Sequence, residues 1–190
     1  MPKQNTPREA VERYVTPFRD AIHCIAHGTL ITSQERVYRI NEVYSLILNN
    51  SDPVQLRSSP AISLSAGQRF RIVRDDDLER GPYRGHTVEY WYLFAADDDR
   101  EMLTFHWTPE AVGRGQKTYP HMHVGPALLA ADSPIFPTTF HKKHVPSGRI
   151  SIESVARFAI EELSVSPLKL NWSDILDHRQ GEFDQYRRTK

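Results

Sequence analysis

Five of the nine histidines in this chain lie between residues 106 and 144, and their surroundings are basic: His106, His121, His123, His141 and His144. Between residues 111 and 149 five cationic side chains stand against Asp132 alone, although the formal net charge of the chain is zero. Imidazole can transfer protons near neutral pH and is the commonest metal ligand in proteins. The segment therefore predicts a site for an anion or for a metal ion.

The spacing of these histidines along the chain indicates which of them can belong to one site. Residues 119–124 predict a strand, on which His121 and His123 leave the same face and could bind one metal ion together. A third ligand would come from His106, His144, His141 or a distant acid. On an extended strand His141 and His144 face opposite ways, so only one of them joins the site, and we favour His144.

The clearest local signal is a β-hairpin formed by residues 88–95 and 102–107 around an acidic turn. One register gives a continuous aromatic face, whereas a slip of one residue sets these rings opposite Thr104 and His106. We expect the aromatic register, which pairs Phe94 with Leu103, Tyr92 with Phe105, and Tyr90 with Trp107. His106 then lies on the other face near Trp91, which makes Trp91 the better candidate for stacking on a ligand.

The remaining pattern predicts an α+β protein with one domain over residues 1–190. We expect an antiparallel sheet over about 36–145, with an N-terminal helix and two C-terminal helices packed on one face. The first helix is predicted at 8–27, and Pro17 should kink or split this helix. The other two are predicted at 151–163, with Ser151 as N-cap, and at 173–187, with Ser173 as N-cap. Within the sheet, a strand is weakly favoured over 36–48, and short strands are predicted at 62–64 and 70–73.

Composition excludes several classes of protein. The zero net charge argues against bulk attraction to nucleic acid, and 39% hydrophobic residues suffice for an ordinary core. The single cysteine, Cys24, cannot form an internal disulfide. The N-terminus lacks the apolar core of a signal peptide, and no apolar run approaches the length of a membrane span. We therefore expect a cytoplasmic protein without membrane association.

The first functional hypothesis is metal-free chemistry on RNA or another phosphodiester or nucleotide, needing no cofactor. In it His106, His121, His123 and His144 act as general acid and base. Lys142, Lys143 and Arg149 bind the substrate and stabilise its charge, and Trp91 stacks. The basic surroundings repel a cation, and carboxylates are scarce nearby, so this hypothesis is preferred to a metal site. If the protein is an enzyme, a metal-independent ribonuclease-like or nucleotide-processing activity is predicted.

Two other hypotheses stay open. The same basic histidine surface could be a non-catalytic binding module for a protein or a nucleic acid. Alternatively the protein is a metalloprotein in which His121, His123 and His106 are the ligands. Each histidine taken singly also fits a half-buried side chain hydrogen-bonded on a sheet surface. Substrate, oligomeric state and pathway do not follow from the sequence.

The stretch from Thr87 to Val145 resembles TumE-type toxins of bacterial toxin–antitoxin systems. The matching segments are Tyr90-Trp91-Tyr92, the acidic turn 97–99, His106-Trp107 and Pro120-His121-Met122-His123. The pair Lys143-His144 is a further, shorter basic match. The pair His106-Trp107 departs from the tyrosine and aspartate of that pattern. The C-terminal run 144–163 resembles uncharacterised bacterial proteins. The resemblance implies a bacterial toxin that acts on RNA or a nucleotide and is neutralised by an antitoxin partner.

Overall fold

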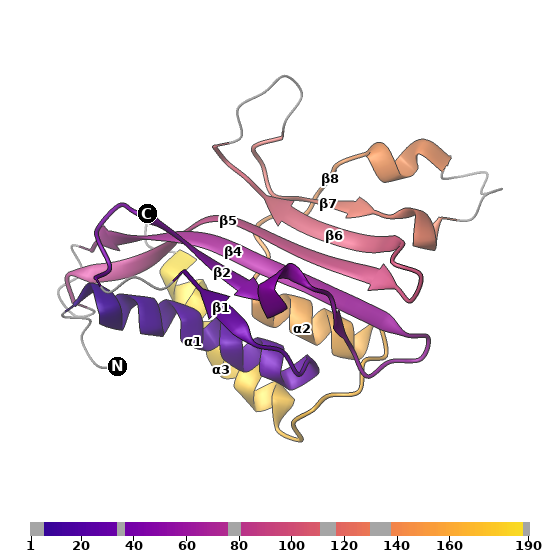
Figure 1. Ribbon diagram of the computed structural model, residues 1–190, viewed down its shortest axis with the longest axis horizontal. Helices are drawn as coiled ribbons and strands as arrows, with labels where there is room; N and C mark the ends of the chain where they lie inside the picture. Colours follow the sequence, from indigo (N-terminus) through magenta and orange to yellow (C-terminus); the bar gives the residue numbers. More distant parts are fainter. Residues whose placement is uncertain (1–5, 34–36, 76–80, 111–116, 130–137, 188–190) are drawn as a thin grey trace.

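The computed structural model describes residues 6–33, 37–75, 81–110, 117–129 and 138–187. Three α-helices pack on one face of an eight-stranded antiparallel sheet (Figure 1), which confirms the predicted α+β arrangement. The helices are α1 (Pro7–Ile25), α2 (Ile152–Glu161) and α3 (Trp172–Arg187). The short 3-10 helices are η1 (Asn49–Ser51), η2 (Pro126–Leu128) and η3 (Thr138–Lys142).

The strands follow the chain across the sheet in the order β1-β2-β4-β5-β6-β7-β8, with β3 paired to β4 off this path. Their bounds are β1 (Leu30–Thr32), β2 (Val43–Leu48), β3 (Val54–Gln55), β4 (Ile62–Arg74), β5 (Tyr83–Ala96), β6 (Glu101–Trp107), β7 (His121–Val124) and β8 (Val145–Pro146). The expected register of the hairpin β5–β6 is confirmed, including the pair Trp91–His106. Because side chains alternate along a strand, this register divides aromatic core from histidine surface.

The hydrophobic core lies between the sheet and the helices. Tyr92, Phe94 and Phe105 are buried there and meet Phe18 of α1 and Phe158 of α2. Beneath β4 and β5 the Tyr14 hydroxyl donates to Gln68 Oε1 over 2.6 Å, and Gln68 Nε2 donates to the Tyr92 hydroxyl over 2.6 Å. This network pairs polar groups that would otherwise be costly to bury.

Several local predictions are corrected. The two short strands at 62–64 and 70–73 are one strand, β4, because Ala66 and Gln68 continue its core face between them. Of the segment predicted at 36–48, residue 36 lies outside the described residues, and within 37–48 only Val43–Leu48 is a strand. Helix α1 runs unbroken through Pro17, since burial of its apolar face outweighs the lost backbone hydrogen bond. Ser151 caps α2 as predicted, with its hydroxyl accepting from Ser154 N, whereas Ser173 lies inside α3.

Candidate functional site

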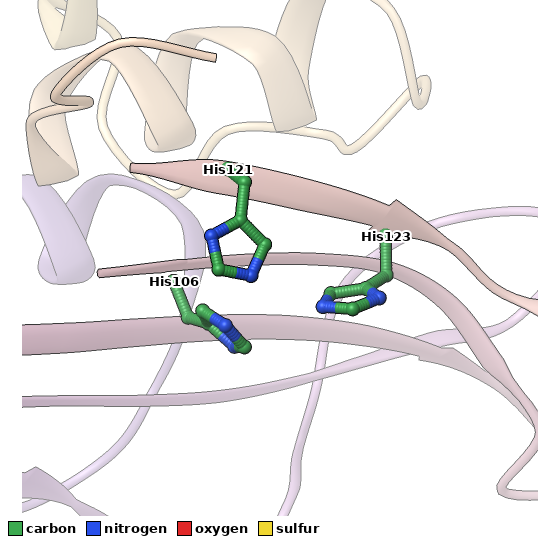
Figure 2. A group of neighbouring side chains, drawn as sticks. All are labelled: His106, His121 and His123. Atoms are coloured by element: carbon green, nitrogen blue, oxygen red, sulfur yellow. The ribbon is translucent and has the colours of Figure 1, made fainter. Parts of the chain in front are cut away.

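Four histidines from two strands and one loop meet on the face of the sheet opposite the helices. His106 of β6 and His121 of β7 are paired across the sheet, and His123 lies two residues further along β7. Their rings converge (Figure 2), with centroids 4.0 Å apart for His106 and His121, and 5.1 Å for His106 and His123. Alternation along β7 thus brings both of its histidines to His106, as the spacing predicted.

His144 joins this group from the segment that precedes β8. Its ring centroid lies 4.7 Å from that of His121 and 4.6 Å from that of His123. The pairing of β8 with β7 places His144 there, because Val145 is opposite Met122 and Pro146 is opposite His121. His141 lies in η3 rather than on an extended strand, so the reason for preferring His144 was wrong although His144 is present. We refer to His106, His121, His123 and His144 as the histidine cluster.

Three of these side chains are arranged as metal ligands would be. One nitrogen each from His106, His121 and His123 can be chosen so that all three lie within 4.8 Å of one another. In a tetrahedral zinc site, with bonds of about 2.0–2.1 Å, the ligand nitrogens stand about 3.3 Å apart. The separations of these nitrogens thus come close to those between the ligands of one ion.

His121 has a defined tautomer. Its Nδ1 lies 2.8 Å from the carbonyl oxygen of Tyr119, a pure acceptor, so Nδ1 carries the proton and donates. Nε2 then holds the lone pair, and it is buried without a hydrogen-bond partner among the described residues. Metal-binding histidines typically donate the other ring N–H to a carbonyl or carboxylate in this way, which fixes the ring and leaves one nitrogen for the ion.

Burial and mutual repulsion lower the pKa values of three members of the cluster, His106, His121 and His144. Burial, together with the charges of His121, His123 and His144, lowers the pKa of His106 from 6.5 to about 4. Burial also lowers the pKa values of His121 and His144, and the charges of His123 and Lys117 act in the same direction. Neutral imidazole is the form that binds a metal or accepts a proton. Conversely, a histidine with a lowered pKa is a poor proton donor at neutral pH.

The basic residues that were expected to form one site lie in different places in the structure. Lys142 and Lys143 are exposed at the end of η3 and directly after it. The guanidinium of Arg149 lies 4.4 Å from the ring centroid of Trp107, whose side chain leaves the helix-covered face of β6, so the structure does not bring Arg149 to the cluster. Arg114 and Asp132 lie outside the described residues.

Sequence reasoning missed three contributors to the site. Lys117 is the cation whose charge acts on His121 and His144, the Tyr119 carbonyl orients His121, and Gly67 of β4 is paired with Trp91. The position of Tyr119 two residues before His121 was visible, but a backbone carbonyl has no signature in the sequence. Trp91 is paired with His106 in the register, as predicted, but its indole lies over Gly67 of β4.

Comparison of the chain with protein-family models, with curated proteins and with solved structures finds no match in any of the three. The resemblance to TumE-type toxins therefore stays a prediction. No described helix is both long and apolar enough to cross a membrane.

Proposed function

We propose that this protein is a metalloprotein in which His106, His121 and His123 bind one divalent transition-metal ion, zinc being the first candidate, and that the bound ion promotes hydrolysis of a phosphate ester. The observation that carries the proposal is the His121 ring. Its Nδ1 is held by the Tyr119 carbonyl, while its buried Nε2 faces the cluster and finds no partner among the described residues. Burying such a polar atom is costly unless something binds it.

The number of ligands favours a catalytic centre over a structural one. Structural zinc sites use four protein ligands, whereas catalytic sites use three and leave one position for water or substrate. His144 contacts the rings of His121 and His123 but lies outside the three-nitrogen group. With its ring against those of His121 and His123, His144 would be the proton acceptor for a water held at this centre. Lys117 would attract the anionic substrate to the same side.

The positions of the basic residues weaken one objection to a metal. That objection was a basic rim formed by Lys142, Lys143 and Arg149. Arg149 lies against Trp107 instead, and Lys142 and Lys143 are exposed. With His106, His121 and His144 neutral at pH 7, the repulsion of a cation is weak, and the donor set of imidazoles suits zinc, copper, iron or nickel.

The test is metal content. Tag-free protein is dialysed against zinc, freed of excess metal and analysed for zinc per chain. We expect one zinc per wild-type chain and loss of zinc in His121→Ala and His123→Ala. The control is His86→Ala, because His86 lies in β5 outside the cluster. Wild type without stoichiometric zinc, nickel, iron or manganese overturns the proposal, as does equal loss in the control.

A second candidate is the metal-free chemistry expected from the sequence, with histidines as acid and base on a phosphodiester. The proximity of four imidazoles and the charge of Lys117 support it, but the lowered pKa values disfavour it, because one histidine must be protonated at neutral pH. Hydrolysis of bis(p-nitrophenyl) phosphate separates the two. A metal centre loses this activity in a strong chelator and regains it with zinc, whereas metal-free chemistry is unaffected.

A further inference from the structure

The sheet has an unpaired edge at β1, at the opposite end of the strand order from the histidine cluster. Among the described strands, β1 is bonded to β2 alone. Ser33 N donates to Ser45 O, which marks one position where β1 bonds to β2. Because bonded positions alternate along an antiparallel pair, the N–H and C=O groups of Leu30 and Thr32 point away from β2. These groups have no hydrogen-bond partner in the described part of the chain.

This edge borders a pocket. Leu30 and Thr32 line it together with α1, beside which β1 lies (Figure 1). Its volume of about 750 Å³ admits several side chains. Val11 and Val15 of α1 give it an apolar surface. An extended polypeptide placed here would bond to the edge of β1 and direct every second side chain toward α1.

Two arginines of α1 give the pocket positive charge. Arg8, Glu12, Val15 and Arg19 follow one another at spacings of four, three and four residues, so they share one face of the helix. Neither arginine forms an ion pair with any described residue. The spacings add up to about 16 Å along a helix, a distance that an extended segment covers in about five residues. Glu12, between the arginines, disfavours an acid at the centre of such a segment.

We propose that this edge binds an extended segment of a partner protein by strand addition to β1. The segment carries an acidic side chain at each end of about five residues and an apolar side chain at its centre. Leu30 and Thr32 bond to its backbone, Arg8 and Arg19 bind its acids, and the valines of α1 contact its central side chain. A second copy of β1 fits less well, because residues 29–33 bring no acid to the arginines.

The probe is the peptide Ser-Glu-Thr-Val-Thr-Glu-Ser with blocked ends and a terminal fluorophore, and fluorescence anisotropy measures its binding. We expect wild type to bind it on the order of tenfold more tightly than the same peptide with lysine in place of both glutamates. Thr32→Pro should abolish binding. Proline there removes an N–H that the sheet does not use, so β1 stays paired to β2. The double variant Arg8→Glu, Arg19→Glu should lose the preference, whereas Lys142→Glu, in η3, should keep it.

Modified probes test the backbone bonds on the unaltered protein. Two peptides are N-methylated at alternate residues, each in one of the two phases. Only every second N–H of an added strand faces β1, so one phase should bind and the other should not. Equal binding of the acidic and lysine peptides, binding that survives Thr32→Pro, or equal behaviour of the two methylated phases overturns the inference. A wild-type dimer in light scattering that becomes a monomer in Thr32→Pro also overturns it, since a second copy then occupies the edge.

Discussion

His106 and His121 face each other across β6 and β7 with their ring centroids 4.0 Å apart, closer than any other pair of rings recorded in the cluster. Two imidazoles at this distance cannot both be charged without strong repulsion. One buried nitrogen of this pair, Nε2 of His121, has no hydrogen-bond partner among the described residues. The pair is therefore stable as neutral rings, and the metal ion proposed above would bind one nitrogen of each.

Metal-free protein should lose stability as the pH falls. The pKa of His106 is 6.5 ordinarily and about 4 in the folded protein, so the unfolded chain takes up a proton first. The contribution of His106 to the free energy of unfolding is thus complete above pH 6.5 and is lost progressively as the pH falls to about 4. Urea denaturation across this pH range measures that free energy. His106→Gln should flatten the dependence, whereas His27→Gln, altering an exposed histidine after α1, should leave it unchanged.

Removal of the Lys117 charge should raise the pKa values of His121 and His144. Lys117 lowers both, so Lys117→Gln favours the protonated rings. Titration of the imidazole C–H signals by NMR in metal-free protein measures the change. Lys142→Gln is the matched control, since Lys142 is an exposed lysine in η3. An unchanged titration in Lys117→Gln, or equal changes in both variants, would show that the cation acting on the cluster has been misassigned.

Tyr14→Phe should destabilise the protein by about 1–3 kcal/mol. The hydroxyl donates to Gln68 Oε1 at 2.6 Å and lies 2.9 Å from Thr87 Oγ1, and its removal leaves buried polar atoms without this partner. The measurement is the free energy of unfolding in urea. Tyr119→Phe, at a side chain that is 40% exposed, should cost much less. Equal costs would contradict the assigned role of the network beneath the sheet.

Two serines were predicted as helix N-caps, and the structure gives that role to only one of them. Ser151 caps α2 and also lies 2.6 Å from Gln180 Oε1 of α3, so Ser151→Ala should cost about 1 kcal/mol or more. Ser173 was predicted as a cap but lies inside α3, so Ser173→Ala should be neutral or slightly stabilising, since alanine is the better helix former. Thermal unfolding of the two variants measures the difference. A larger cost at Ser173 would restore the cap predicted there.

The parts of the fold that were predictable are those with strong periodic patterns. The aromatic residues of 88–107 fixed the hairpin register, because a slip would have exposed them, and this register also placed His106 beside Trp91. Alternation placed His121 and His123 together. The long strand β4 was missed because Gly67 and Gln68 interrupt its apolar pattern, and both residues have special roles: one supports Trp91 and the other joins the tyrosine network.

The sequence did not predict where residues of the loops lie relative to the histidine cluster. Arg149 and Lys117 have the same charge and lie on either side of β7 in the chain, yet Arg149 packs on Trp107 and Lys117 acts on the cluster. Local propensity does not determine which face a loop residue reaches. The metal hypothesis was ranked below metal-free chemistry because Lys142, Lys143 and Arg149 were all assigned to one basic site and because carboxylates are scarce nearby.

The metal centre is tested most directly by zinc K-edge X-ray absorption of the zinc-loaded protein, which reports the type and number of atoms bound to the ion. We expect three imidazole nitrogens at about 2.0–2.1 Å, with one further light-atom ligand. His106→Ala should reduce the imidazole count by one. A spectrum without imidazole scattering, or one unchanged in His106→Ala, would contradict a centre formed by His106, His121 and His123.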